Sequence, residues 1–200
     1  MDYKDLTIQS YDLHAGDFSD KFKKLMDFKR RPEFGHFIDL LNGKNILDLG
    51  CGSGDHSVFF KEKGLDVTSV DLSDGMIEIC KKKGLRVLKM DIEVLDFSPN
   101  SFNGIWAVTS LLHVPKSKLK TVIERLSLIL ANLGIIYVCV KEGQGEGLIE
   151  DSDGKTSRFF SCWTEKEMKE LFEDYFNLIE IEKFRVGKTT FLKAFFRKKS

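Results

Sequence analysis

The chain has 200 residues, a length that suits one domain with its own hydrophobic core. Hydrophobic residues make up 42% of it and charged residues 31%, a balance that excludes an intrinsically disordered chain. Lysine plus arginine and aspartate plus glutamate both number 31. The resulting net charge of zero excludes a globally basic protein that binds many phosphates of a nucleic acid.

The spacing of the cysteines indicates a protein of a reducing compartment. The four cysteines show neither metal-ligand spacing nor a disulfide framework, so reduced thiols are expected at Cys51, Cys80, Cys139 and Cys162. The first residues lack the cationic and apolar regions of a signal peptide, and no apolar run approaches the roughly 20 residues of a membrane span. We therefore expect a cytoplasmic protein with no membrane partner and no metal site.

The first 44 residues are predicted to form a helical cap. Their apolar residues fall on helix faces that would be buried, at Phe18, Phe22, Leu25, Phe34, Phe37, Ile38 and Leu41.

From residue 45 to residue 140, short apolar runs alternate with helical stretches. Strands are expected at 45–49, 66–70, 86–90, 105–108 and 134–140. Helices are expected at 55–63, where Asp55 has the capping position, at 73–83, and from Pro115 to Leu130. Near-continuously apolar strands that alternate with helices predict a parallel sheet covered on both faces.

The remaining residues depart from this alternation but belong to the same single domain, 1–200. Residues 141–163 are rich in glycine and acidic residues, which predicts a flexible loop at the ligand edge of the sheet. Residues 141–153 within it are either a lid over an acceptor or a disordered surface loop, and the acidic and aromatic content of this area favours a neutral or cationic acceptor. Residues 164–200 are predicted to form a helix, opened by a Thr164–Glu167 capping box, and a terminal antiparallel hairpin of strands 176–184 and 189–197.

A glycine-rich turn follows the first predicted strand. Its spacing is Gly50-x-Gly52-x-Gly54, at the place where a parallel sheet binds ligands. A dinucleotide site would need its third glycine at position 55, where Asp55 stands. A carboxylate there competes with a pyrophosphate for the positive end of the helix dipole. The turn therefore favours a nucleoside ligand without phosphate groups.

Three carboxylates lie at the ends of the first three predicted strands: Asp48, Asp71 and Asp91. Because the carboxyl ends of parallel strands meet at one edge of a sheet, we expect these acids to converge on one crevice. Asp71 has the position from which a carboxylate accepts hydrogen bonds from ribose hydroxyls. Crowded acids favour a ligand that brings positive charge or hydrogen-bond donors, and a sulfonium nucleoside with an amino-acid tail brings both.

These features occur in the order of a known family. Asp48-x-Gly50-x-Gly52-x-Gly54, Asp71, Asp91-Ile92 and the stretch 102–106 resemble the ordered motifs of class I S-adenosylmethionine-dependent methyltransferases. The resemblance implies a three-layer α/β/α sandwich around a Rossmann-like, mostly parallel, seven-stranded sheet, and the terminal hairpin agrees with the family's antiparallel seventh strand. It also implies S-adenosyl-L-methionine as cofactor and S-adenosyl-L-homocysteine as product.

The same resemblance assigns roles in the cofactor site. The glycine turn would hold the methionine portion and Asp71 the ribose hydroxyls. Asp91 would bond the adenine amino group, with the Ile92 amide on the ring. The resemblance implies the following cofactor-binding residues: Tyr11, Asp48, Gly50, Cys51, Gly52, Gly54, Asp71, Leu72, Met76, Asp91 and Ile92.

A narrower resemblance concerns the acceptor side. The stretches 106–115, 140–143 and 158–160 are similar to a group of small bacterial methyltransferases of unassigned substrate. The chain departs from the family at Asn103, where the family has an acid, and at 132–134, where it has a Pro-Gly-Gly turn. His113 lies just beyond the fourth strand and is the candidate general base. The alternative is that His113 caps a helix or bonds a main-chain carbonyl.

The expected activity is methyl transfer to an oxygen or nitrogen atom of a small molecule by in-line displacement. A small acceptor is favoured, and no nucleic acid, because the chain has no separate domain to recognise a macromolecule; we expect a monomer or homodimer. Three alternatives stay open. They are an RNA or protein methyltransferase whose target docks on the basic stretches 81–83 or 197–199, a nicotinamide-dependent redox domain, and a non-catalytic cofactor-binding module.

Overall fold

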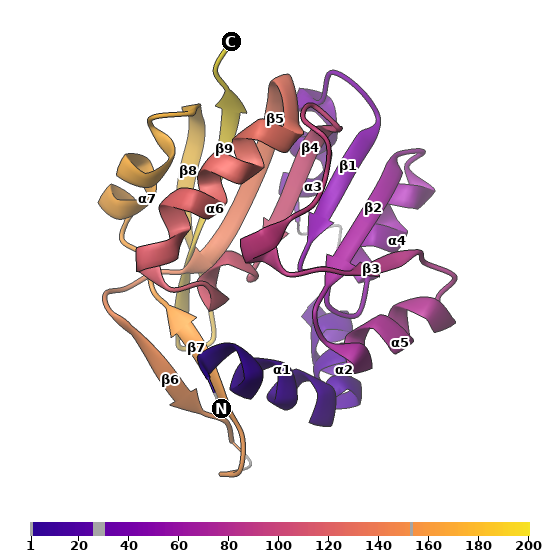
Figure 1. The fold of residues 1–200 in the computed structure, drawn as a ribbon, viewed down its shortest axis with the longest axis vertical. Helices are drawn as coiled ribbons and strands as arrows, with labels where there is room; N and C mark the ends of the chain where they lie inside the picture. Colours follow the sequence, from indigo (N-terminus) through magenta and orange to yellow (C-terminus); the bar gives the residue numbers. More distant parts are fainter. Residues whose placement is uncertain (1, 26–30, 153) are drawn as a thin grey trace.

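A seven-stranded sheet forms the centre of the protein (Figure 1). The computed structural model describes residues 2–25, 31–152 and 154–200, and the side chains of Phe22 and Leu25, two of the predicted buried residues, lie outside the described part. The strand order is β3-β2-β1-β4-β5-β9-β8. The strands are β1 Asn45–Leu49, β2 Asp66–Asp71, β3 Val87–Lys89, β4 Phe102–Val108, β5 Leu130–Lys141, β8 Phe176–Val186 and β9 Thr189–Lys198.

The strand order reverses beside β1. The chain runs outward from β1 through β2 to β3, then returns to the other side of β1 to form β4 and β5, all in parallel. β9 pairs with β5 and with β8 in antiparallel register, which confirms the predicted terminal hairpin. An open parallel sheet binds ligands at such a reversal, outside the carboxyl ends of the strands. The topology therefore places a ligand crevice between the ends of β1 and β4.

Helices cover both faces of the sheet, which confirms the three-layer architecture. One face packs against α6 (Lys116–Ile129) and α7 (Glu165–Phe172) through a large aliphatic core. The other packs against α3 (Glu33–Leu40) and α4 (Asp55–Glu62) through an aromatic core, in which Trp106 stacks on Tyr137 with ring centroids 4.2 Å apart. Leu119, Val122 and Ile123 of α6 are buried in the first core, as their helical spacing predicts.

Two N-terminal helices lie below the carboxyl edge of the sheet. α1 (Tyr3–Leu13) and α2 (Ala15–Leu25) agree with the expected helical cap. Figure 1 shows α1 crossing beneath the sheet, with α5 (Asp74–Lys82) at one end and the hairpin of β6 and β7 at the other. α1 therefore covers the edge at which the parallel strands end. Within the described ranges, no helix is both long enough and apolar enough to cross a bilayer.

The segment 141–163 is not a loop without secondary structure, and this part of the prediction is corrected. It forms an antiparallel hairpin of β6 (Glu146–Glu150) and β7 (Ser157–Ser161). β7 packs on α1, where the Phe159 amide donates a hydrogen bond to Thr7 Oγ1 over 3.0 Å. Phe159 and Phe160 are buried. The apolar anchoring of β7 overrides the local preference that the surrounding glycines give for a loop.

The start of α4 also differs from the prediction. Gly54, with φ +77°, has the N-cap position in place of Asp55, and no side chain caps the helix. Asp55 is the first helical residue, and its carboxylate accepts hydrogen bonds from Ser53 Oγ at 2.7 Å and from Lys83 Nζ at 2.8 Å. The acidic group still lies in the first turn of α4, so the electrostatic argument against a pyrophosphate there is unchanged.

Close packing of α3 on β4 depends on a glycine. A Cβ added at Gly104 would lie 2.5 Å from Leu41 Cδ2 and 2.7 Å from Phe37 Cζ. Gly104→Ala should therefore lower the free energy of unfolding by about 1–3 kcal/mol, because overpacking forces the helix outward. Gly35, in α3 itself, has nothing within 4 Å of an added Cβ, so Gly35→Ala should raise the stability by up to about 1 kcal/mol. Urea denaturation measures both, and equal midpoints for the two variants would contradict this packing.

Candidate functional site

A cavity lies between α1 and the carboxyl edge of the sheet. Its walls come from α1, the glycine turn after β1, and the junction of β2 with α5. They are completed by the residues that follow β3 and β4, including the short 3-10 helices η2 (Ile92–Val94) and η3 (Leu111–His113). Nine of the predicted site residues line this cavity: Tyr11, Gly50, Gly52, Asp71, Leu72, Met76, Asp91, Ile92 and His113.

Three predicted cofactor residues are not among those that line the cavity. Cys51 is buried, with its Sγ 4.0 Å from that of Cys80. Gly54 packs its backbone against Leu85 and Cys80. Asp48 is 1% exposed, and its Oδ2 accepts a hydrogen bond of 2.5 Å from Ser57 Oγ. The expected convergence of three acids is therefore corrected to two, Asp71 and Asp91.

Asp71 joins the glycine turn to the start of α5. Its Oδ2 accepts the Gly52 amide at 2.8 Å, and its Oδ1 accepts the Ser73 amide at 3.0 Å. Burial raises the pKa of this carboxyl, while the backbone hydrogen bonds oppose the shift. An ionised carboxylate has about four acceptor sites. Asp71 therefore retains acceptor capacity for donors of a ligand in the cavity.

At the glycine turn, main-chain atoms without a covering side chain form part of the cavity wall. Gly50 has φ +68° and Gly52 has φ +53°, in the left-handed region that glycine adopts without strain. A Cβ at Gly50 would lie 2.5 Å from Ser110 Cβ, so the end of β1 and the segment after β4 come together only because Gly50 has no side chain. Ser110 Oγ is buried and has no hydrogen-bond partner in the described part of the chain.

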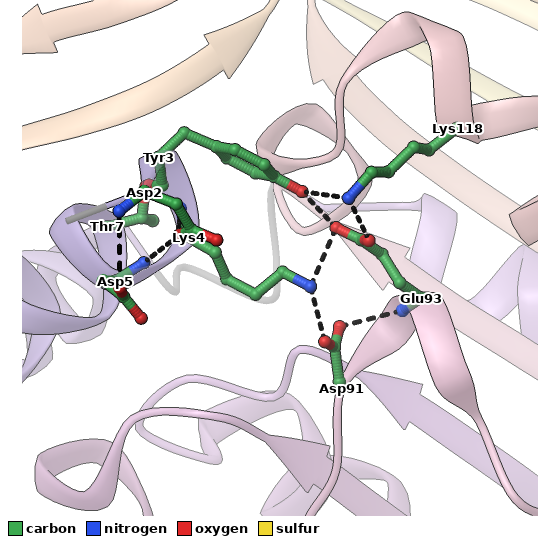
Figure 2. A network of polar contacts seen from close by, with 8 residues as sticks. All are labelled: Asp2, Tyr3, Lys4, Asp5, Thr7, Asp91, Glu93 and Lys118. Carbon is green, nitrogen blue, oxygen red and sulfur yellow. Dashed lines mark hydrogen bonds and ion pairs between the residues drawn. The ribbon is translucent and has the colours of Figure 1, made fainter.

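A network of ion pairs connects α1 to the acids after β3 (Figure 2). Lys4 Nζ lies 2.6 Å from Asp91 Oδ2 and 3.0 Å from Glu93 Oε1. Glu93 also binds Lys118 Nζ at 2.7 Å and accepts a hydrogen bond from the Tyr3 hydroxyl. Asp91 Oδ1 accepts the Glu93 amide at 2.9 Å as the cap of η2.

Sequence reasoning missed Lys4 and Glu93. Both line the cavity, yet no motif includes them, because Lys4 reaches the site only when α1 folds back across the sheet edge. The spacing Asp91-x-Glu93 was the one available signal, since it places two acids at the end of the third strand.

His113 is held at both ring nitrogens. Its Nδ1 lies 2.6 Å from the Phe159 carbonyl oxygen. A carbonyl only accepts, so Nδ1 carries the proton and Nε2 accepts from the Tyr11 hydroxyl at 2.9 Å. Burial lowers the pKa of His113 to about 4, and the nearby Arg158 and Lys141 add to the shift. The imidazole is therefore neutral at pH 7. The main-chain bond agrees with the structural alternative for His113, and its role as a base stays a prediction.

Comparison with known proteins finds a matching family model and several similar methyltransferases. Residues 46–134 match the methyltransferase domain family. A ubiquinone biosynthesis O-methyltransferase of Coxiella burnetii is 35% identical over 81 residues, which cover 38% of this chain and 35% of that protein. A SAM-dependent methyltransferase of Methanosarcina mazei superimposes with a TM-score of 0.75 at 22% identity, covering 84% of this chain and 97% of that one.

The family match covers a little under half of the chain, and the fold is the one seen in S-adenosylmethionine-dependent methyltransferases. A further methyltransferase structure, the 1,6-didemethyltoxoflavin-N1-methyltransferase of Burkholderia thailandensis with S-adenosylhomocysteine bound, has a TM-score of 0.67 at 22% identity and covers 93% of this chain and 87% of that one. At these identities the structural likeness shows the fold alone. The chain matches about a third of the length of the curated Coxiella burnetii methyltransferase.

The residues of the cavity fit S-adenosylmethionine, the cofactor of the methyltransferases that share this fold. The cavity lining contains three carboxylates, Asp71, Asp91 and Glu93, against one cation, Lys4. A net negative lining favours a ligand with sulfonium and amino groups and disfavours one with several phosphates. The acceptor capacity of Asp71 and the bare backbone of the glycine turn match a ribose and an amino-acid tail.

The buried Asp48 gives the stability of the protein a distinctive pH dependence. Burial raises the pKa of its carboxyl to about 7. Between about pH 4 and pH 7 the folded protein therefore holds a proton that the unfolded chain has released, so this contribution to the free energy of unfolding falls as the pH rises through that range.

Asp48→Asn should remove this contribution, because an amide does not titrate and its oxygen still accepts from Ser57. The stability of the variant relative to wild type should increase between pH 5 and pH 8, as measured by urea denaturation. The opposite trend from the buried histidines His56 and His113, whose pKa values are lowered, cancels in this difference. Asp66→Asn, at an exposed carboxylate of β2, is the control. An equal relative stability of Asp48→Asn at both pH values would refute the raised pKa.

Proposed function

We propose that this protein is an S-adenosylmethionine-dependent methyltransferase that methylates an oxygen or nitrogen atom of a small molecule by in-line displacement. One observation carries the proposal: Asp71 and Asp91, at the ends of neighbouring strands, line the same cavity, and Asp71 retains acceptor sites for a ligand. Two ordered carboxylates beside a glycine turn suit a nucleoside that donates hydrogen bonds and carries no phosphate.

Each of these cavity residues has a proposed role in binding one part of the cofactor. The backbone at Gly50 and Gly52 would receive the amino-acid tail, and Asp71 the ribose hydroxyls. Asp91 would accept from the adenine amino group and share its carboxylate with Lys4, which holds one of its oxygens. Met76, 1% exposed in the cavity wall, would pack on the apolar face of the adenine ring.

Methyl transfer requires little of the protein beyond positioning the cofactor and the acceptor. When bound, the cofactor supplies a methyl group on a positively charged sulfur, which is a good leaving group. The acceptor atom forms its bond to the methyl carbon while the carbon–sulfur bond breaks and its electrons go to sulfur. Holding two reactants in line is worth about 7–11 kcal/mol. An acceptor proton, where there is one, would pass to the Tyr11 hydroxyl oxygen while the hydroxyl's own proton moves to His113 Nε2.

A small acceptor is supported by the way the cavity is closed. α1 and the β6–β7 hairpin cover the carboxyl edge, and β7 is fixed to α1 by the Phe159–Thr7 hydrogen bond. The Burkholderia thailandensis structure contains a small heterocycle as its methyl acceptor, and the Coxiella burnetii relative is named for ubiquinone biosynthesis. These relatives favour a low-molecular-weight acceptor here as well.

Isothermal titration calorimetry with S-adenosylhomocysteine tests the cofactor site. Wild type should bind it with micromolar affinity. Asp71→Asn should weaken binding by about 1.5–3 kcal/mol, or tenfold and more, because charge-assisted hydrogen bonds to the ribose are lost. Asp74→Asn is the matched control, since this exposed carboxylate of α5 pairs with Lys89 and is absent from the cavity lining. An absence of heat with wild type, or an unchanged affinity of Asp71→Asn, would overturn the proposal.

A further inference from the structure

Lys141 is a half-buried cation without a counter-ion. It is the last residue of β5, on the carboxyl edge that also bears His113. Its Nζ lies 3.4 Å from the centroid of the Phe160 ring. Throughout residues 2–25, 31–152 and 154–200, no carboxylate forms an ion pair with it. Holding an ammonium group partly out of water without an anionic partner is unfavourable. We therefore expect Lys141 to bind the anionic group of a ligand.

Two acids of the neighbouring segment, Asp151 and Glu142, have other partners. Asp151 binds Arg158 at 2.9 Å through Nε and 2.6 Å through Nη2, and its other oxygen accepts from Ser10 Oγ at 2.6 Å. Glu142, adjacent to Lys141 in sequence, pairs with Lys183 at 3.0 Å. The acidic composition of the segment, which favoured a neutral or cationic acceptor, therefore does not describe the charge that faces the site.

A second cation lies beside Lys141. The guanidinium carbon of Arg158 is 5.3 Å from the centroid of the same Phe160 ring and 5.2 Å from that of Tyr11. Its Nη1 lies 3.4 Å from the Tyr11 hydroxyl. With Asp151 neutralising one charge, the pair Lys141 and Arg158 leaves one net positive charge at this end of the site. Burial and the charges of Arg158 and Lys21 lower the pKa of Lys141, and Asp151 offsets this only in part.

The cation cluster adjoins the proposed methyl-transfer site. The His113 ring lies 5.0 Å from the Phe160 ring, centroid to centroid, and both His113 and Tyr11 line the cavity. One aromatic ring therefore contacts Lys141, Arg158 and a residue of the cavity wall. Acids line the cofactor part of the cavity, whereas Lys141, Arg158 and Phe160 lie next to the lining residues His113 and Tyr11 without lining the cavity themselves.

We propose that the methyl acceptor is an anion, whose carboxylate or phosphoryl group binds Lys141 beside Arg158. The inference rests on the proposed function, since it names the substrate class of that site. An ammonium group accommodates either kind of anion as a point charge. The aromatic side chains Phe160 and Tyr11 would pack on the uncharged body of the acceptor.

The test uses three probes on protein saturated with S-adenosylhomocysteine, in a ligand-observed NMR titration. Phenylacetate and phenylphosphonate carry the two candidate anions, and phenylacetamide is their neutral counterpart. At least one anion should bind wild type more tightly than the amide, and the tighter of the two identifies the group. Lys141→Met should weaken that anion about tenfold or more and leave the amide unaffected, while Lys141→Arg should restore most of the binding.

Lys183→Met is the matched control, because this exposed lysine pairs with Glu142 and should bind all three probes as wild type does. Equal affinities of wild type for the anions and the amide, or anion binding that survives Lys141→Met, would overturn the proposal. Calorimetry of wild type with S-adenosylhomocysteine separates this failure from that of the proposed function. Cofactor binding without anion preference refutes only the acceptor class.

Discussion

The site depends on one half-buried carboxylate. Asp71 ends β2 and accepts two backbone amides, from Gly52 in the turn after β1 and from Ser73 at the start of α5. A buried carboxylate is unfavourable unless hydrogen bonds compensate for the lost hydration, and these two amides do so. They also fix the turn relative to β2. Because both bonds come from backbone, the carboxylate keeps a defined direction and remains available to a ligand.

Charge is distributed unevenly along the cavity edge. The acids Asp71, Asp91 and Glu93 lie at the end formed by β1, β2 and β3, where Lys4 is their one cationic neighbour in the lining. Lys141 of β5 and Arg158 of β7 lie outside the cavity lining, next to its residues Tyr11 and His113. Such a gradient would orient a cationic cofactor and an anionic acceptor toward each other. Opposite charges on the two ligands would then assist the close approach that in-line transfer requires.

α1 connects the two ends. Lys4, near its start, binds the acids after β3, and Tyr11, near its end, contacts His113 and Arg158. Individual ion pairs at a partly exposed edge contribute little to stability. The helix is therefore attached by several modest contacts and not by one strong one, which suits a segment that must admit ligands to the cavity beneath it.

Local signals predicted most of the fold and part of the site. The glycine turn, Asp71, Asp91 and the terminal hairpin are encoded within short stretches, and the structure places them as predicted in the fold. Asp48 was misplaced because β1 is buried on both faces, so its pattern does not indicate which side chain points to the ligand edge. The contacts of Lys4 and the isolation of Lys141 depend on partners distant in sequence, and no short motif records them.

The main proposal is that the acidic part of the cavity, at the ends of β1, β2 and β3, binds an adenosine ligand that carries sulfur and no phosphate. Thermal unfolding of the protein with S-adenosylhomocysteine and, separately, with NADH tests it most directly. A ligand at a hundredfold excess over its Kd stabilises the folded state by about 2.7 kcal/mol, which corresponds to a rise of roughly 5–10 °C in Tm for a domain of this size. S-adenosylhomocysteine should produce this rise and NADH should produce none. A rise with NADH alone would contradict the proposal.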